Sequence, residues 1–375
     1  MNRILIIGGG ILGASAAYHL AKAGRDVTII DRGERGQATG AAAGIISPWL
    51  SQRRNKAWYA LAKGGAAFYP SLIDSLEQDG ETSTGYKRVG AVSVHTDPAV
   101  LDLAEERAYS RREDAPEIGE ILRLSEEETG ERVPMLADDF ASVWIGGAAR
   151  VNGRQLLEAL LSASKKHGAR VIGGSATVSA EEGKVNGVIV DGRLIEGDTV
   201  IVAAGAWAPG AVAPLGLNVD VRSQKAQILH LRLDDRSTGE WPVIMPPRRH
   251  YIVPSEDGRI VVGTTHEDEH SFELEPTAGG IHEMLDKALV TAPALADAAF
   301  EEAKVGYRPF TADNLPVMGP LGGVGGLYFA NGLGSSGLTV GPFLGTELAK
   351  MVLGEPLNID PALYDPSKTI LNGES

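Results

Sequence analysis

The sequence predicts an α/β fold with two domains, one built on a parallel sheet and the other on a mostly antiparallel sheet. Three observations support this prediction. Residues 4–32 have the pattern strand, glycine-rich turn, helix and second strand, which is typical of a buried parallel sheet. Residues 221–275 contain several strand candidates in succession. Residues 306–345 are glycine-rich again, and a length of 375 residues suits two domains.

The opening stretch predicts a Rossmann-type unit that binds a dinucleotide. The apolar run Ile4–Ile7 precedes Gly8, Gly10 and Gly13, which have the G-x-G-x-x-G spacing. These glycines permit a tight turn, a close approach of the backbone to a pyrophosphate, and close packing of helix on strand. The helix that follows offers its N-terminal N–H groups to the pyrophosphate. The second strand, "DVTIID", ends at Asp31, whose carboxylate suits the ribose hydroxyls of an adenosine. An acid there disfavours a 2′-phosphate, which leaves both NAD and FAD open.

The later patterns predict that the two domains alternate along the chain. The expected elements are a small-residue loop over 33–48, a helix over 55–79, a half-buried strand over 89–96, a charge-rich and partly helical segment over 97–140, a helix and then a strand over 153–172, a β-meander followed by the buried strand "TVIVAAGA", the strands "KAQILHLRL", "RHYIVPS" and "RIVVGTT", and the helix "IHEMLDKALVTAPAL". The dinucleotide-binding domain is therefore expected to comprise residues 1–87, 148–221 and 305–375, and the antiparallel-sheet domain residues 88–147 and 222–304. The interface between two such domains is a common place for a small-molecule pocket.

Composition excludes several classes of function. A net charge of −14 argues against nucleic acid, because neutralising phosphates requires clustered Lys and Arg. The chain has no cysteine, so it can form no disulfide, no thiolate–metal site and no cysteinyl link to a cofactor; we expect no metal. No apolar run reaches the roughly 18 residues that span a bilayer. We expect a cytoplasmic protein, and the sequence leaves peripheral membrane contact and homo-oligomerisation open.

Five stretches in order carry a family resemblance: "IIGGGILGASAAYHLAKAG…VTIID", "ATGAAAGII", "VIVAAGAWA", "VGYRPFTADNLPVMGP" and "LYFANGLGSSGLTVGPFLG". With them, the sequence resembles the D-amino acid oxidase, glycine oxidase and sarcosine oxidase (DAO) family of FAD-dependent amine oxidoreductases. The resemblance implies a glutathione-reductase-like, DAO-type fold, in which a Rossmann-type FAD-binding domain carries an inserted antiparallel-sheet substrate domain. It also implies that the cofactor is FAD rather than NAD, held non-covalently because cysteine is absent.

The resemblance further implies which residues bind FAD. The ADP half would lie against Gly8, Gly10, Gly13 and Asp31, with Ile11, Leu12 and Arg32 beside them. Thr39, Gly40, Ala43, Gly44 and Ile45 would line the flavin side, Val178 would contact the adenine region, and Ala204, Gly205 and Trp207 would close over the pyrophosphate. The last stretch would present backbone amides and a helix N-terminus to the flavin through Asn331, Gly332, Leu333, Gly334, Ser335, Gly337, Leu338 and Thr339.

On the substrate side, Arg308 in "GYRPFTAD" matches the arginine of the family that pairs with the substrate carboxylate. A guanidinium suits a carboxylate because two parallel N–H donors meet two oxygens. Tyr251 in "RHYIVP" matches a tyrosine that several relatives use against the same carboxylate. The alternatives are an arginine that bonds loop carbonyls and a tyrosine that packs in a strand. Glycine oxidases carry an arginine where this chain has Ala330, which puts glycine specificity in doubt.

These residues favour FAD-dependent oxidation of the C–N bond in a D-amino acid or D-imino acid. The Cα–H would pass to flavin N5 as hydride, and the imine product would hydrolyse to a keto acid and ammonia. The sequence leaves open whether oxygen or another acceptor then takes the electrons. A glycine or sarcosine oxidase is an alternative. So are an NAD-dependent dehydrogenase, which would be colourless, and a flavin-binding subunit without its own substrate.

Overall fold

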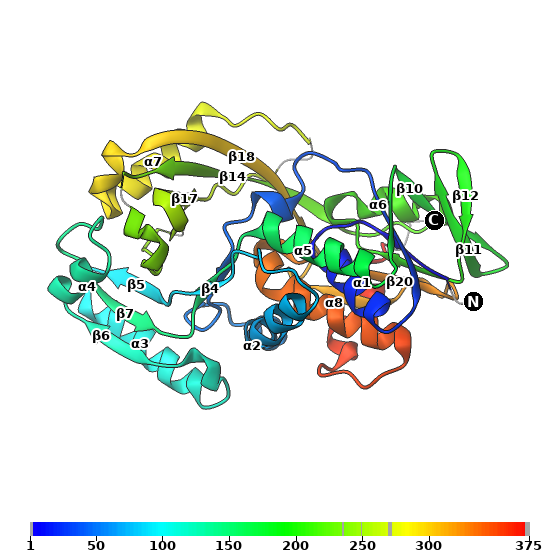
Figure 1. Cartoon of the computed structure of the whole chain (residues 1–375), viewed down its shortest axis with the longest axis horizontal. Coiled ribbons are helices and arrows are strands. Elements are labelled where there is room, and N and C mark those ends of the chain that lie inside the picture. Colours follow the sequence, from blue (N-terminus) through cyan, green and yellow to red (C-terminus); the bar gives the residue numbers. More distant parts are fainter. Residues whose placement is uncertain (1–2, 235, 249, 269–271, 372–375) are drawn as a thin grey trace.

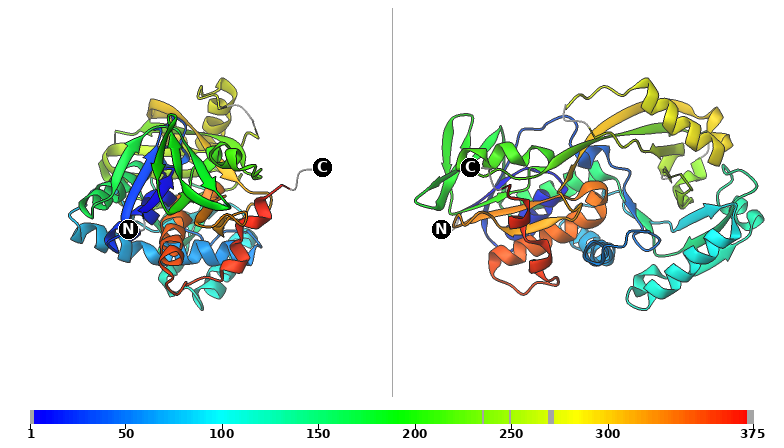
Figure 2. Two further views of the ribbon diagram at one scale, coloured as in Figure 1. Left: turned by 90° about the vertical axis from the view of Figure 1, so that its right-hand side faces the viewer. Right: turned by 180° about the vertical axis from the view of Figure 1, so that it is seen from behind.

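The structure, a computed structural model, describes residues 3–234, 236–248, 250–268 and 272–371. The molecule is elongated, with two lobes side by side along its long axis (Figures 1 and 2). One lobe contains the N-terminal strand and helix α1, and the other contains α3, α4 and α7. Strands β14 and β18 run from one lobe to the other.

The first lobe is built on a six-stranded sheet in the order β19-β20-β13-β1-β2-β9. All neighbouring strands are parallel except β19, which is antiparallel to β20. The bounds are β1 Arg3–Ile7, β2 Asp26–Asp31, β9 Arg170–Gly173, β13 Thr199–Val202, β19 Val317–Pro320 and β20 Leu327–Asn331. Ile4, Leu5, Ile6 and Ile7 are all buried, as expected for a central strand covered on both faces. The predicted parallel sheet is therefore confirmed, and it draws on three separate segments of the chain.

Three helices pack together beside this sheet: α1 (Ile11–Lys22), α2 (Lys56–Gln78) and α8 (Gly337–Leu353). The Ser15 hydroxyl of α1 donates to the Pro342 carbonyl of α8 over 2.6 Å. A Cβ at residue 65 of α2 would lie 2.0 Å from the Thr339 carbonyl oxygen, so this close crossing requires Gly65. These contacts fix the first turns of α1 and α8 relative to each other, and the site described below lies against both.

The second lobe is built on an eight-stranded sheet in the order β18-β14-β17-β16-β15-β5-β7-β6. Its pairs are antiparallel except β15–β5. The bounds are β5 Ala91–His95, β6 Ile121–Leu124, β7 Ala141–Ile145, β14 Arg222–Arg232, β15 Val243–Met245, β16 Tyr251–Pro254, β17 Arg259–Gly263 and β18 Ala299–Phe310. Three helices belong to this lobe: α3 (Pro98–Arg112), α4 (Glu126–Arg132) and α7 (Ala278–Thr291). The strands predicted over 89–96 and 221–275 are confirmed.

One predicted boundary is wrong. We expected the chain to leave the substrate domain between residues 304 and 305, but β18 continues through that point to Phe310 in the same sheet. The reason is that β18 pairs with β14 along its whole length, from Ala299 opposite Arg232 to Phe310 opposite Arg222. Arg308 therefore belongs to a strand of the substrate sheet.

Two small sheets and several short elements complete the fold. The predicted meander is the sheet β10-β11-β12, and the crossings between lobes are the sheet β3-β8-β4. Their bounds are β10 Ala176–Glu181, β11 Lys184–Val190, β12 Arg193–Glu196, β3 Ile45–Ile46, β8 Ala149–Arg150 and β4 Lys87–Arg88, with helices α5 (Gly153–Lys166) and α6 (Ala208–Val212). The charge-rich segment contains α3 and α4, and α4 begins with a capping box between Ser125 and Glu128. Among the described residues, no helix is both long and apolar enough to cross a membrane.

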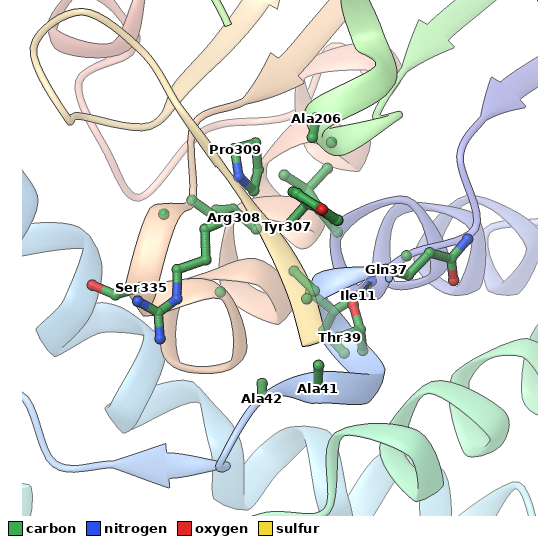
Figure 3. A pocket seen from close by; sticks show the side chains of 18 of the residues that line it. Ile11, Gln37, Thr39, Ala41, Ala42, Ala206, Tyr307, Arg308, Pro309 and Ser335 are labelled. Atoms are coloured by element: carbon green, nitrogen blue, oxygen red, sulfur yellow. Dashed lines mark hydrogen bonds between the residues drawn. The ribbon is translucent and has the colours of Figure 1, made fainter. Parts of the chain in front are cut away.

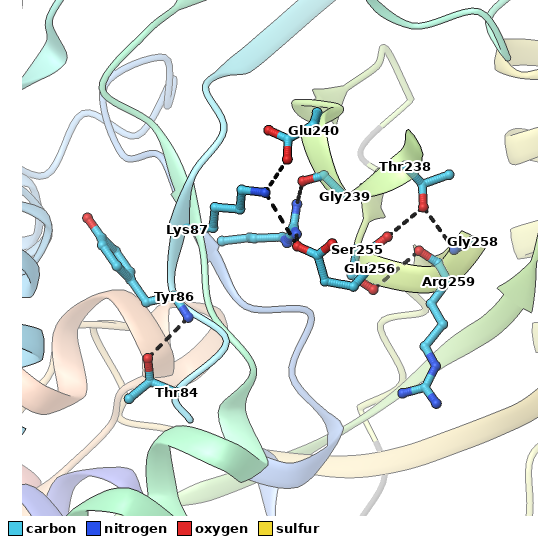
Figure 4. Close-up of polar contacts among 11 residues, drawn as sticks. Thr84, Tyr86, Lys87, Thr238, Gly239, Glu240, Ser255, Glu256, Gly258 and Arg259 are labelled. Carbon is cyan, nitrogen blue, oxygen red and sulfur yellow. Dashed lines mark hydrogen bonds and ion pairs between the residues drawn. The ribbon is translucent and has the colours of Figure 1, made fainter. Parts of the chain in front are cut away.

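Polar contacts tie the crossing strands to the substrate domain (Figure 4). The Lys87 ammonium lies 2.5 Å from a carboxylate oxygen of Glu240. The buried Arg150 guanidinium donates to the Gly239 carbonyl over 3.0 Å and pairs with Glu256 over 2.8 Å. Because β4 and β8 carry these groups, the two lobes are joined by charge-assisted bonds as well as by continuous chain.

Candidate active site

A single cavity of about 990 Å³ runs between the two lobes. One end lies at the glycine turn after β1, and the other end lies at Arg308 of β18 and Tyr251 of β16. Its wall includes the first residues of α1 and of α8, the loop over residues 37–48, and strands of the substrate sheet. Figure 3 shows part of this wall, with Ile11 and Thr39 on one side and Arg308 and Ser335 on another.

The glycine turn has the geometry that the motif predicts. Gly8 has φ = +103°, and a Cβ there would lie 2.5 Å from the Ala203 carbonyl oxygen. A Cβ at Gly13 would lie 2.0 Å from the Gly8 carbonyl oxygen, so helix α1 packs directly on the turn. Gly10 and Ile11 line the cavity, and the Ile11 N–H at the start of α1 donates to the Thr39 hydroxyl over 3.1 Å. The positive end of the α1 dipole therefore faces the cavity, as binding of a pyrophosphate requires.

Asp31 contributes to this turn as well as to the cavity wall. One carboxylate oxygen accepts from the Gly9 N–H over 2.6 Å, and the other accepts from the Gly33 N–H over 2.7 Å and the Gln37 side-chain amide over 3.0 Å. A carboxylate has about four acceptor sites, so capacity remains for a ribose hydroxyl. Asp31 thus fixes the shape of the turn that would hold the dinucleotide.

The central wall of the cavity joins two distant segments. Thr39, Ala43, Gly44 and Ile45 line it from the loop before α2. From the start of α8 and the turn before it come Leu333, Gly334, Ser335, Gly337, Leu338 and Thr339. The Thr339 hydroxyl donates to the Ile45 carbonyl over 2.9 Å and holds the two segments together. The N-terminus of α8 faces the cavity here, and its partial positive charge would stabilise an anionic reduced flavin.

The cavity also includes Gly8, Leu12, Arg32, Ala204, Gly205 and Trp207, as predicted. Five predicted cofactor residues are not part of its wall: Gly13, Gly40, Val178, Asn331 and Gly332. The Val178 side chain is buried in a hydrophobic core, and Gly174, Ser175, Ala176 and Thr177 line the cavity instead. Asn331 donates to the Gly205 carbonyl over 2.9 Å and accepts from the Gly332 N–H over 2.7 Å, so it positions neighbouring backbone.

Arg308 and Tyr251 meet at the other end of the cavity. Nη2 of Arg308 donates to the Thr264 hydroxyl over 3.1 Å, and the guanidinium lies beside the Tyr251 side chain. The other terminal nitrogen, Nη1, is buried and has no hydrogen-bond partner. Burial lowers the pKa of Arg308 from its ordinary value, and burial raises that of Tyr251, an effect that Arg308 opposes. No loop carbonyl accepts from Arg308 among the described residues, so the guanidinium keeps donors for a carboxylate.

Arg53 is a cavity residue that our sequence analysis missed. It lies in the loop before α2 and lines the same cavity as Arg308. Its Nη2 donates to the Ser335 hydroxyl over 2.8 Å, and its guanidinium carbon lies 4.7 Å from the centre of the Trp58 ring. Burial and repulsion by the Arg308 charge lower the pKa of Arg53. The sequence signal was the basic run "RRNK" directly after the small-residue loop and directly before the predicted helix.

Ala330 is not part of the cavity wall. Ala330 lies in β20, is 1% exposed and packs in a hydrophobic core outside the cavity wall. Strand residues alternate between the two faces of a sheet, and residue 330 faces the core that contains Leu344 and Met318. The alanine at this position therefore gives no reason to disfavour glycine-type substrates. The second positive group at this end of the cavity is Arg53.

The cavity wall also contains histidines and carboxylates. His250 and His266 both line the cavity. Burial lowers the pKa of His250 to about 4, so it is neutral near pH 7. Among the described residues, the carboxylates on the cavity wall are Asp31 and Glu34, both near the glycine turn. The part of the chain that the structure describes holds no group of three or more His, Cys, Asp or Glu arranged for a metal ion.

The glycine turn and the two helix N-termini that face the cavity suit a dinucleotide cofactor such as FAD. Comparison with known proteins agrees. Residues 3–351 match the family model DAO, FAD dependent oxidoreductase, and the chain belongs to this family. Its cofactor is accordingly FAD, and the chain is an enzyme of the amine-oxidising type. The predictions of FAD rather than NAD and of the DAO-type fold are confirmed.

Several relatives are similar over nearly their whole length. The chain is 59% identical to an uncharacterised oxidoreductase, YurR, of Bacillus subtilis, covering 98% of this chain and 99% of that one. It is 30% identical to a glycine oxidase of Pseudomonas aeruginosa, with the same coverage. Among solved structures, iminodiacetate oxidase from Chelativorans sp. BNC1 superposes with a TM-score of 0.94 at 44% identity, covering 97% of this chain and 99% of that one. Glycine oxidase from Geobacillus kaustophilus gives a TM-score of 0.85 at 26% identity, covering 97% and 98%.

Proposed function

We propose that this enzyme oxidises the C–N bond adjacent to a carboxylate in a small amino or imino acid, and that glycine and its N-substituted derivatives are the first substrates to test. One observation carries the proposal: Arg308 presents a buried Nη1 without a partner to the cavity, next to the hydroxyl of Tyr251. A buried cationic donor without an acceptor is costly, and a substrate carboxylate would satisfy it. Relatives named glycine oxidase and iminodiacetate oxidase support this substrate class.

The chain's own residues would act mainly by positioning. The Arg308 guanidinium offers parallel N–H donors to a carboxylate, and Thr264 holds one edge of the guanidinium in place. Tyr251 would donate a further hydrogen bond, because its raised pKa keeps the phenol protonated. FAD, when bound, supplies the acceptor for one hydride, which carries the two electrons removed from the substrate. Fixing the carboxylate thus fixes the carbon that loses hydrogen.

The amine must be unprotonated before its carbon can lose hydride, and among the described residues no carboxylate lines the Arg308 end of the cavity to act as a base. The nearby positive charges of Arg308 and Arg53 would lower the pKa of a bound ammonium group, since like charges disfavour the charged form. The substrate amine would therefore lose its proton to solvent. Loss of hydride then leaves a cationic iminium ion, and water hydrolyses it to a carbonyl acid and an amine or ammonia.

The proposal is tested by an anaerobic bleaching screen of the purified holoenzyme with glycine, sarcosine, iminodiacetate, D-alanine, L-alanine, D-proline and L-proline. We expect glycine-type amines to remove the flavin absorbance near 450 nm in about one equivalent. Repeating each positive reaction with oxygen and with an artificial acceptor separates an oxidase from a dehydrogenase. If no amine or imino acid bleaches the flavin, the chain is a flavin-binding protein without an amine substrate and the proposal is wrong.

A further inference from the structure

Among the described residues, two arginines and no carboxylate line the substrate end of the cavity. Arg308 and Arg53 both line it, and neither forms an ion pair with a carboxylate among the described residues. The carboxylates of the cavity wall, Asp31 and Glu34, lie near the glycine turn. Each arginine is close enough to the other that the charge of Arg308 lowers the pKa of Arg53. Two cations in repulsive proximity indicate that an anion is expected between them.

Arg53 is held in this place by specific contacts. Its bond to Ser335 connects it to the turn before α8, which forms part of the cavity wall. Its guanidinium stacks on Trp58, and the indole N–H of Trp58 donates to the Ser336 hydroxyl over 2.9 Å. In Figure 3 the Arg308 side chain extends toward Ser335, the residue that binds Arg53. A stacked and hydrogen-bonded guanidinium has lost much of its freedom already, so little further entropy is lost when it binds an anion.

Arg53 also forms one wall of a second hollow, of about 500 Å³, that lies beside the main cavity. Four other cations line this outer hollow: Arg54, Lys56, Arg107 and Arg111. No carboxylate lines it among the described residues, although the chain as a whole carries a net charge of −14. Helix α2 begins here, with Asn55 as its N-cap. A concave surface of one charge attracts ligands of the opposite charge and raises their association rate.

We infer that the substrate is a dicarboxylic amine, in which Arg308 binds the carboxylate next to the oxidised carbon and Arg53 binds a second carboxylate on the other substituent of the nitrogen. This inference rests on the function proposed above and specifies its substrate class. A monocarboxylic amine such as sarcosine would leave Arg53 unpaired. A dicarboxylic secondary amine would neutralise both guanidinium groups, and its net negative charge suits the outer hollow.

The inference is tested by binding, without turnover, of two thioethers that lack an oxidisable nitrogen. Thiodiacetate carries two carboxylates, and (methylthio)acetate carries one. In isothermal titration calorimetry, we expect the wild-type holoenzyme to bind thiodiacetate at least about tenfold more tightly than (methylthio)acetate. A single hydrogen bond to a charged group is enough to give a tenfold difference in affinity. Equal affinities of the two ligands for the wild type would overturn the inference.

The variant Arg53→Met should abolish most of this tenfold preference while leaving the affinity for (methylthio)acetate within about twofold. Arg53→Lys should retain part of the preference, because it keeps the charge but loses the planar fork. The matched control is Arg132→Met: the Arg132 guanidinium also stacks on a tryptophan, 4.5 Å from the centre of the Trp144 ring, and Arg132 lies outside both hollows. Flavin content reports that each variant is folded.

Kinetics provide a second measurement. Arg53→Met should raise the KM for iminodiacetate about tenfold or more and leave the KM for sarcosine nearly unchanged. If Arg53→Met affects both substrates equally, or neither, Arg53 does not bind a second carboxylate. The two proposals fail separately. An enzyme that oxidises sarcosine and iminodiacetate with the same efficiency contradicts only the dicarboxylate inference, whereas an enzyme that oxidises no amine contradicts the proposed function.

Discussion

The two ends of the cavity are built in different ways. The glycine-turn end is made of backbone: N–H groups, a helix N-terminus and one acid, Asp31, that itself binds backbone N–H groups. The Arg308 end is made of side chains from strands β16 and β18 and from the loop before α2. Backbone geometry recognises a pyrophosphate common to many proteins, whereas side chains recognise the particular substrate. The first end therefore indicates the cofactor class, and the second indicates the substrate.

The sharpest test of this contrast is Arg308→Met. Removing one partner of a buried charge pair costs about 2–5 kcal/mol, so we expect kcat/KM to fall about 100-fold or more. The flavin content should stay that of the wild type, because Arg308 lies at the end of the cavity away from the glycine turn.

Arg308→Lys should raise KM strongly, since a point charge replaces a bidentate fork. Steady-state kinetics and the flavin absorbance spectrum check both, and unchanged activity would remove Arg308 from the site.

The converse change is Gly13→Ala. A Cβ there would lie 2.0 Å from the Gly8 carbonyl oxygen, so the turn or α1 must shift, at a cost of about 1–3 kcal/mol. We expect the purified variant to contain much less FAD. Gly24→Ala is the control: Gly24 has φ = +75° with no atom within 4 Å of its Cβ position, and it lies outside the cavity wall. That variant should lose about 1 kcal/mol of unfolding free energy and keep its flavin. Equal flavin content in the two variants would contradict this account of the turn.

A smaller effect is expected for Asp31→Ala. The change removes an acceptor for ribose and also the bond to the Gly9 N–H. We expect the Kd for FAD to rise about tenfold, because charge-assisted hydrogen bonds contribute about 1.5–3 kcal/mol each. Titration of the apoprotein with FAD, followed by flavin fluorescence, measures this. With FAD saturating, the KM for the amine should not change; a changed KM would show that the two ends of the cavity are coupled.

Tyr251→Phe should have the smallest effect. The loss of one hydrogen bond is worth about 1 kcal/mol, so KM should rise about fivefold. Burial raises the pKa of Tyr251, and the phenol therefore stays protonated and able to donate up to about pH 10. The rise of kcat/KM with pH should then have the same shape in the wild type and in Tyr251→Phe from pH 6 to pH 9.5. A descending limb below pH 9.5 that the variant lacks would show that Tyr251 ionises in this range.

What the sequence could predict follows the same division between the two ends. The strand, the glycines, helix α1 and Asp31 lie within 29 consecutive residues, 3–31, and local spacing alone determines their geometry. Arg53 was missed because its place in the cavity depends on Ser335, 282 residues away. Ala330 was assigned by position in a motif, but side-chain direction in a strand alternates, and the Ala330 side chain faces a hydrophobic core. The boundary near residue 304 was misplaced because only the pairing partner, β14, shows that β18 continues.

The continuous pairing of β14 and β18 has a consequence for how ligands enter. The ladder extends from Arg222 opposite Phe310, near the cavity, to Arg232 opposite Ala299, at the far side of the substrate sheet. A hinge motion that separates the two lobes would bend the β14–β18 strand pair and break its backbone hydrogen bonds. We therefore expect the lobes to move little during turnover. Entry of substrate into the cavity and release of product should instead depend on local displacement of the loop that contains Arg53. Crystals of the enzyme should accordingly tolerate soaking with small acids without cracking.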